Sequence, residues 1–132
     1  MSTRKVLVAE DEMAHFELVK MALNRLNIND VTHAEDGAIA LKHIEDATPP
    51  FNLIISDLQM PNMSGDELLL KVRQDKYHCE VPFIMMSALD SLNAAISTKD
   101  KGATIFIYKP VSVENLTRKI RTALSIDFQV DN

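Results

Sequence analysis

Cysteine is almost absent from this chain, and long apolar runs are absent altogether. The single thiol, Cys79, excludes an internal disulfide and suits a reducing compartment, so the cytoplasm is the expected location. No apolar stretch approaches the roughly 20 residues that a membrane span needs, so no membrane segment is predicted. The N-terminal MSTRKVLVAEDE has a short apolar run that ends at once in acids, unlike a signal peptide.

The chain also lacks a concentrated basic patch. Its net charge is −5, and its Lys and Arg residues are scattered along the sequence. Direct binding to nucleic acid would need clustered positive charge, so it is not expected. The length of 132 residues predicts a single domain, 1–132, with a short C-terminal tail and a core of its own.

Short, nearly continuous apolar runs alternate with helix-length segments. Runs of this kind suit strands that are covered on both faces, as in a parallel sheet. The segments between them carry apolar residues three and four apart, which indicates helices. The alternation predicts an α/β fold with right-handed crossovers, built on a doubly wound five-stranded parallel sheet. The predicted strands are Val6–Ala9, Phe51–Ile55, Val81–Met86 and Thr104–Tyr108, with a weaker edge strand at Val31–Ala34.

Two helices have particular sequence signals. Ser64 followed by Glu67 reads as a capping box that opens the third helix. The fourth, predicted over Ser91–Lys101, has few apolar anchors and is a candidate for motion.

Polar residues follow four of the predicted strands. They are Glu10, Asp11, Asp57, Ser87 and Lys109. Ligands of open α/β sheets gather outside the carboxyl ends of the strands, so these five side chains are expected to converge on one edge. Asp57 ends an apolar run, and a buried charge is costly unless it is paired, metal-bound or protonated.

Carboxylates held close together favour a cation. Oxygen ligands without His or Cys select a hard ion, and a partly hydrated Mg²⁺ is the natural choice. Lys109 and Ser87 are suited to holding phosphoryl oxygens, and Asp57 to attacking phosphorus as a nucleophile. Each residue alone has an ordinary explanation, since acidic turns and helix-capping aspartates are common. Their joint placement at the strand ends favours the functional interpretation.

The chain resembles the receiver domains of two-component response regulators. The phrase DLQMPNMSG matches the D-x-x-M-P-x-M-x-G signature of that family, and VAEDE, MMSA and IYKP supply the acidic pair, the hydroxyl residue and the lysine followed by proline. The resemblance covers residues 4 to about 124. It implies a flavodoxin-like (βα)5 fold with strand order 2-1-3-4-5. The matched signature residues are Asp57, Met60, Pro61, Met63 and Gly65.

The resemblance also implies roles for individual residues. Asp57 would accept phosphate from a phosphohistidine on a sensor histidine kinase or a phosphotransfer protein. Asp11, Asp57 and the backbone carbonyl of Gln59 would ligate Mg²⁺, with Glu10 acting at or through a water of that site. The acidic pair is Glu-Asp where many relatives have Asp-Asp.

Further roles concern the response to phosphorylation. Ser87 and Lys109 would bind the phosphoryl oxygens. Phe106 occupies the place of an aromatic that turns inward when Ser87 moves, and here it lacks a tyrosine hydroxyl. The face made by helix 4, strand 5 and helix 5 would then change and contact a downstream protein. The bond between Lys109 and Pro110 is typically cis in this family.

Several alternatives remain open. A receiver used only for docking, without phosphorylation, and a receiver cut from a longer hybrid kinase are two of them; an initiating methionine and a short tail favour a stand-alone chain. An aspartate-nucleophile phosphatase of the haloacid-dehalogenase type needs an acid where this chain has Gln59. A flavodoxin-like FMN carrier would bind its phosphate after the first strand, where Glu10, Asp11 and Glu12 would repel it. The chain is thus expected to promote only its own phosphorylation and dephosphorylation. None of the four histidines has metal-ligand spacing. His15 is expected on a helix face beside the site, and contact with the kinase is its functional alternative.

Overall fold

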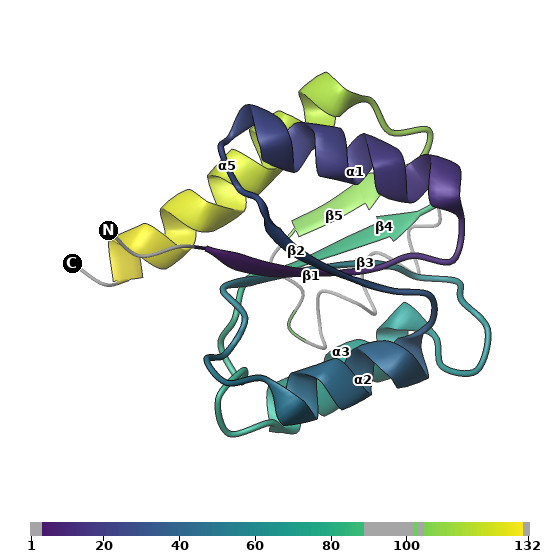
Figure 1. Cartoon of the computed structure of the whole chain (residues 1–132), viewed down its shortest axis with the longest axis vertical. Coiled ribbons are helices and arrows are strands. Elements are labelled where there is room, and N and C mark those ends of the chain that lie inside the picture. Colours follow the sequence, from purple (N-terminus) through teal and green to yellow (C-terminus); the bar gives the residue numbers. More distant parts are fainter. Residues whose placement is uncertain (1–3, 89–101, 103–104, 131–132) are drawn as a thin grey trace.

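The computed structural model describes residues 4–88, 102 and 105–130, which fold around a five-stranded parallel sheet (Figure 1). The strand order is β2-β1-β3-β4-β5, so the predicted flavodoxin-like order is confirmed. Interior strands β3 and β4 are buried throughout, and this explains their continuous apolar runs. The weaker run forms edge strand β2. The strands are β1 (Lys5–Ala9), β2 (Asp30–Ala34), β3 (Leu53–Asp57), β4 (Phe83–Ser87) and β5 (Ile105–Tyr108).

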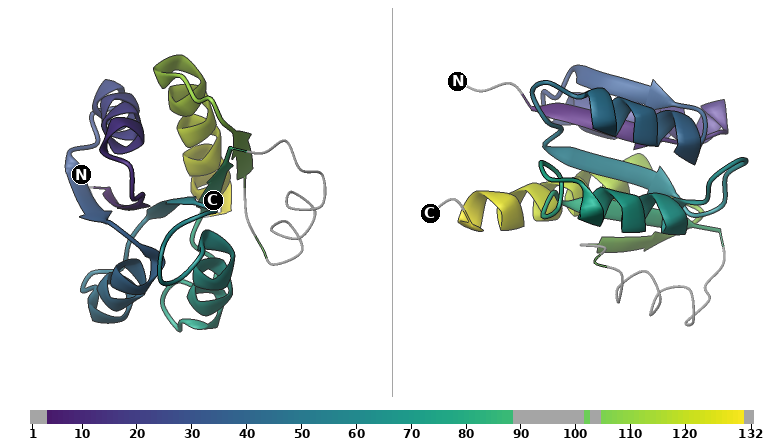
Figure 2. Two further views of the ribbon diagram at one scale, coloured as in Figure 1. Left: turned by 90° about the vertical axis from the view of Figure 1, so that its right-hand side faces the viewer. Right: turned by 90° about the horizontal axis from the view of Figure 1, so that it is seen from below.

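Helices cover both faces of the sheet. Helices α1 and α5 lie on one face, and α2 and α3 lie on the other (Figure 2). The helix predicted over Ser91–Lys101 lies outside the described residues. No helix of the described part is long and apolar enough to cross a membrane. The helix bounds are α1 (Met13–Arg25), α2 (Gly37–Asp46), α3 (Gly65–Gln74) and α5 (Val113–Val130).

Each face of the sheet has its own hydrophobic core. Along β1, Val6 and Val8 pack beneath α1 and α5, whereas Leu7 and Ala9 pack beneath α2 and α3. All four side chains are fully buried. This alternation follows from the two-residue period of a strand. Helices therefore cover the apolar side chains on both faces of the sheet. The polar residues that follow the strands lie outside these two cores, at the carboxyl edge of the sheet.

Side-chain caps fix the starts of α2 and α3. Asp36 accepts a hydrogen bond from the Ile39 backbone N–H at 2.8 Å. Ser64 accepts one from the Glu67 N–H at 3.2 Å, which confirms the predicted start of α3. The Ser64 hydroxyl also donates to Glu67 Oε1 at 3.4 Å.

Strands β3 and β4 begin later than predicted, although Phe51, Val81 and Pro82 before them are buried. Phe51 is 5% exposed, but its N–H donates to Nε2 of His78 at 3.0 Å and not to a neighbouring strand. Pro82 has no N–H to give to a ladder, so Val81 and Pro82 precede β4. Burial and strand pairing are therefore separate properties here, and apolar content alone misplaces the boundaries by two residues.

His78 is a buried polar residue with a structural task. Its ring is 1% exposed, and Nδ1 lies 2.6 Å from Asp75 Oδ2 while Nε2 accepts the Phe51 N–H. His78→Leu would leave that N–H buried and unpaired, so we expect a loss of about 1–3 kcal/mol in the free energy of unfolding. Urea unfolding measures the loss, and half-buried His43 on α2, replaced by Leu, serves as the control. Equal losses of unfolding free energy in the two variants would contradict the structural role of the His78 hydrogen bonds.

Candidate functional site

Asp57 is the last residue of β3, and it is almost fully buried at 5% exposure. Pairing with β4 extends one residue past Asp57, because the Leu58 N–H bonds to the carbonyl of Met86 at 2.7 Å. Gly65 closes the following loop by donating its N–H to the Leu58 carbonyl at 2.8 Å. The chain thus delivers a carboxylate to the carboxyl edge of the sheet and holds it there by neighbouring backbone.

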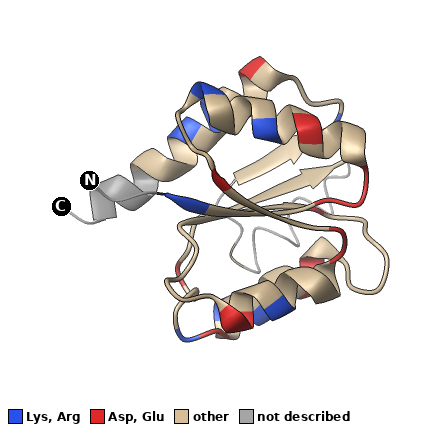
Figure 3. Cartoon of the chain, viewed as in Figure 1, with Lys and Arg blue, Asp and Glu red and all other residues tan. Residues whose placement is uncertain are grey.

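Glu10 and Asp11 follow β1 at the same edge, and Figure 3 shows acidic residues along this loop. Glu10 is fully buried and Asp11 is exposed. One carboxylate oxygen from each of Glu10, Asp11 and Asp57 lies within 4.8 Å of the others. The convergence predicted from the strand ends is therefore present for the acids. His33 supports the loop, since its Nε2 lies 2.8 Å from the Glu10 carbonyl oxygen.

Lys109 follows β5 and points into the acidic group. Its Nζ lies 3.0 Å from Asp57 Oδ2 and 3.6 Å from Glu10 Oε1. The bond between Lys109 and Pro110 is cis, as the resemblance implied. The Lys109 N–H donates to the Ser87 carbonyl at 2.6 Å, which ties the end of β5 to the end of β4. One buried ammonium therefore faces two buried carboxyl groups, and it can balance the negative charge of only one of them.

Ser87 ends β4 and is 1% exposed. In the register of the sheet, Asp57 pairs with Met86, so Ser87 lies one residue further along the adjacent strand. The structure thus brings Ser87 to the same edge as Asp57. Gln59 stands two residues beyond Asp57, exposed in the loop between β3 and α3.

Phe106 lies within β5 and is partly buried against the core beneath α2 and α3. Its backbone pairs with Met85 of β4. Its ring centroid lies 4.9 Å from that of Tyr108, which is 42% exposed. Phe106 therefore connects the buried sheet with an exposed aromatic at the surface.

His15 lies beside the site, on the helix face where the sequence placed it, and its direct contact with Lys109 was not predicted. Its Nδ1 lies 3.1 Å from Lys109 Nζ, and an ammonium can only donate, so the imidazole nitrogen accepts. The same nitrogen is 3.5 Å from Glu12 Oε2 and 3.9 Å from Glu10 Oε2. The one available signal was the position of His15, four residues after Asp11 in the first turn of α1, which sets it beside the acid-bearing loop.

The environment of Glu10 favours a positive ion. Its Oε1 is buried and has no hydrogen-bond partner among the described residues. Burial, followed by repulsion from Asp57, raises the pKa of Glu10 to about 8, although Lys109 acts in the opposite direction. A hard cation among the carboxylates would relieve both costs. The donor set of Glu10, Asp11 and Asp57 consists only of oxygens, so it fits Mg²⁺.

The raised pKa of Glu10 gives a pH dependence with a definite sign. Between its ordinary value of 4.5 and about 8, the folded chain holds a proton that the unfolded chain has released. This stabilisation is complete below pH 4.5 and is lost as pH rises through about 8. Urea unfolding of metal-free protein is therefore expected to show falling stability over this range.

Glu10→Gln is the matched control for this pH effect, because it is neutral throughout and should remove most of the slope. Saturating Mg²⁺ should also flatten the slope, since the cation takes over the role of the proton. A metal-free wild type whose stability rises over the same range would contradict the assignment.

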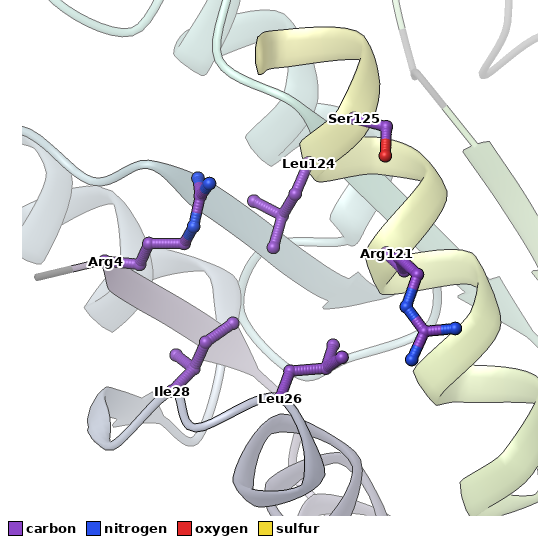
Figure 4. Close-up of a pocket in the computed structure, with 6 residues that line it drawn as sticks. All are labelled: Arg4, Leu26, Ile28, Arg121, Leu124 and Ser125. Atoms are coloured by element: carbon purple, nitrogen blue, oxygen red, sulfur yellow. The ribbon is translucent and has the colours of Figure 1, made fainter.

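A separate cavity of about 240 Å³ lies at the opposite edge of the sheet (Figure 4). Arg4 precedes β1, and Ile28 lies between α1 and β2, so this cavity is at the amino ends of the strands. None of the predicted site residues lines it. Charge and strand polarity, and not cavity size, therefore locate the functional site. The lining residues are Arg4, Leu26, Ile28, Arg121, Leu124 and Ser125.

Comparisons with known proteins agree with this geometry. The family model described as the response regulator receiver domain matches residues 6–121. The Chemotaxis protein CheY1 of Helicobacter pylori is 32% identical over 120 residues, which cover 91% of this chain and 96% of that protein. The Response regulator protein PilR of Pseudomonas aeruginosa is 32% identical over 126 residues, covering 96% of this chain and 27% of that protein.

A solved structure gives the same result for the fold. The chemotaxis response regulator CheY4 of Vibrio cholerae superimposes with a TM-score of 0.84 at 30% identity, and the match covers 92% of this chain and 99% of that chain. The matching unit is nearly the whole of CheY1 but about a quarter of PilR. Such a unit thus occurs both alone and as part of a larger protein.

Proposed function

This chain belongs to the response regulator receiver domain family, and on that premise we propose that it is a signalling switch that accepts a phosphoryl group on Asp57. The observation that carries the proposal is the buried Asp57 carboxylate, paired with Lys109 at 3.0 Å inside an acidic group. Receiver domains serve phosphorylation-dependent signalling, and the acidic pair, the aspartate, the hydroxyl residue and the lysine of the family's pattern each have a counterpart in this chain. One receiver unit over residues 4 to about 124 is the proposed domain.

The transfer step follows from the chemistry of Asp57. A carboxylate oxygen would form the new P–O bond while the P–N bond to a donor histidine breaks, and the bonding electrons return to the imidazole nitrogen. The donor would be a sensor histidine kinase or a histidine phosphotransfer protein. The Asp57 carboxylate is held at the end of a fully buried strand, so little motion is needed to orient it.

Asp11, Asp57 and the backbone carbonyl of Gln59 would hold Mg²⁺, with Glu10 acting directly or through a water. When bound, the ion would neutralise charge on the carboxylates and the phosphoryl oxygens. Lys109 is oriented by its contacts with Asp57 and His15, and its ammonium would also donate to a phosphoryl oxygen. The chain would thereby promote its own phosphorylation and dephosphorylation without acting on another substrate.

The signal would leave through a protein surface. Ser87 would bind a phosphoryl oxygen, and its carbonyl is already bonded to the Lys109 N–H at 2.6 Å. Through this bond, a movement of Ser87 would also displace the end of β5, the strand that carries Phe106 and Tyr108. Phosphorylation would shift the population between two packings of Phe106 and so change the face around β5 and α5. The contribution of the predicted fourth helix lies outside the described residues.

The other functions fit the site less well. A phosphatase of the haloacid-dehalogenase type needs a general acid two residues after the nucleophile, and Gln59 cannot supply a proton in that role. The phosphate of a bound FMN would lie against Glu10, Asp11 and Asp57, whose carboxylates would repel it. A receiver that only docks would have no need of a buried ion pair beside an acidic group. Lys and Arg are interspersed with Asp and Glu on the described helices, which favours a protein over nucleic acid as the partner (Figure 3). The cytoplasm is the proposed location.

The test is the mass of the intact chain after incubation with acetyl phosphate, a small phosphodonor that needs no kinase. We expect a gain of one phosphoryl group in the presence of Mg²⁺ and no gain in EDTA. Absence of any gain with Mg²⁺, both from acetyl phosphate and from a phosphorylated phosphotransfer protein, would leave docking without phosphorylation as the function.

A further inference from the structure

The loop between β3 and α3 carries Gln59 and is joined to the start of α2. We propose that Asp36 and Asn62 form a clamp that positions this loop for Mg²⁺ binding; the inference rests on the proposed magnesium site. Asn62 Nδ2 donates to Asp36 Oδ2 at 2.7 Å. These residues are 26 positions apart in the chain, and within the described part of the structure no hydrogen bond or ion pair joins them to the acidic group or to Lys109.

Asp36 is suited to holding a partner in place. The residue is 7% exposed, and its other oxygen, Oδ1, caps α2 by accepting the Ile39 N–H at 2.8 Å. One carboxylate oxygen is therefore fixed by the helix, and the second presents a charged acceptor to the loop. A hydrogen bond to a charged group is stronger than one between neutral groups. The loop is thus tied to an element that the fold already holds rigid.

Asn62 is suited to the tip of the loop. Its backbone has a φ of 69°, a left-handed conformation that asparagine tolerates better than most residues. The neighbouring Met63 also meets α2 closely, because a Cβ added to Gly37 would collide with the Met63 carbonyl oxygen and lie 2.9 Å from the Met63 Cβ. The close contact of Gly37 with Met63 and the hydrogen bond of Asp36 with Asn62 therefore hold the same part of the loop against α2.

The positions in the chain connect this clamp to the metal. Gln59 lies between Leu58, whose N–H and carbonyl are both bonded, and Asn62 at the tip. With both ends of this segment anchored, the Gln59 carbonyl has a defined direction before the ion arrives. Groups that orient metal ligands from outside the coordination sphere typically affect metal affinity by about 10- to 100-fold. We expect the lower end here, because the carboxylates remain in place.

Two single substitutions break the clamp in different ways. Asn62→Gly removes the amide and keeps a residue that accepts a positive φ. Asp36→Ser keeps a helix cap, since a serine hydroxyl accepts the Ile39 N–H, but its side chain is too short to serve Asn62 as well. Exposed Glu35→Gln is the control for charge, because it removes one negative charge next to Asp36 and leaves the clamp intact.

The experiment is calorimetric titration of the metal-free full chain with Mg²⁺. We expect the Mg²⁺ dissociation constant to rise about tenfold in each single clamp variant, and no further in the double variant, because both act through one bond. Glu35→Gln should stay close to wild type. Thermal unfolding of the metal-free proteins shows which variants are folded at the titration temperature, and if Asp36→Ser is not, Asn62→Gly decides alone.

The outcomes separate the two levels of the proposal. A wild-type chain that binds no Mg²⁺ would overturn the proposed magnesium site itself. A wild type that binds Mg²⁺, with clamp variants that bind it equally well, would overturn the clamp only. Additive losses in the double variant would show that the two residues act independently, and this too would overturn the clamp.

Discussion

Asp57→Asn is expected to abolish phosphoryl transfer to the chain, leaving no mass gain above that of a sample without phosphodonor. The amide has no anionic oxygen to attack phosphorus, and it removes one of the three carboxylates of the acidic group. Intact-mass spectrometry with Mg²⁺ and acetyl phosphate measures the loss. Asp46→Asn, at the exposed end of α2, is the matched control and should be phosphorylated like the wild type. A full gain in Asp57→Asn would show that another residue is the acceptor.

The same variant has an expected effect on folding that distinguishes it from a merely damaged protein. Without metal, Asp57 repels the fully buried Glu10, and Lys109 must serve both acids. Removing one charge leaves a balanced pair of Glu10 and Lys109. The metal-free variant should therefore be at least as stable as the wild type at pH 8, by urea unfolding. A misfolded variant would instead lose phosphorylation and stability together.

Gly65→Ala is expected to disrupt both the fold and the site. A Cβ at this position would collide with the Asp57 carbonyl oxygen and lie 2.9 Å from Met85 Sδ. The collision is with backbone of a buried strand, so it cannot be relieved by a side-chain rotation. We expect a loss of about 3 kcal/mol or more in the free energy of unfolding, and a strong fall in phosphorylation because Asp57 itself must shift.

Leu70→Ala is the control for this variant. Leu70 lies on the exposed side of the same helix and is 41% exposed, so its truncation should cost less than about 1 kcal/mol. Urea unfolding and intact-mass spectrometry on both variants complete the comparison. A Gly65→Ala protein as stable as Leu70→Ala would contradict the close packing of α3 against the end of β3.

The convergence of the acids and Lys109 could be predicted from sequence because topology alone enforces it. Parallel strands place all their carboxyl ends at one edge, so residues that follow the runs ending at Ala9, Ile55 and Tyr108 must meet there. Ser56 and Asp57 belong to β3 although they are polar, and an apolar count therefore ends the strand too early. Phe51 and Val81 show the converse, since both are buried without joining a strand.

Contacts between side chains from distant elements could not be predicted in this way. The contact of His15 with Lys109 depends on the angle at which α1 leaves the acidic loop, and no spacing in the sequence encodes that angle. The bond between Asn62 and Asp36 is a similar case. In the sequence alone, Asn62 is an ordinary turn residue and Asp36 an ordinary helix cap. Only the packing of the β3–α3 loop against α2 brings the two side chains together.

The central claim is that Asp57 carries the phosphoryl group as an acyl phosphate. Borohydride reduces an acyl phosphate on aspartate to homoserine, so peptide sequencing of the phosphorylated and reduced wild-type chain identifies the acceptor without any substitution. The expected result is homoserine at position 57, only in samples that received both Mg²⁺ and phosphodonor. Homoserine at another aspartate, or a phosphoryl group that persists on a histidine or serine, would contradict the proposed function.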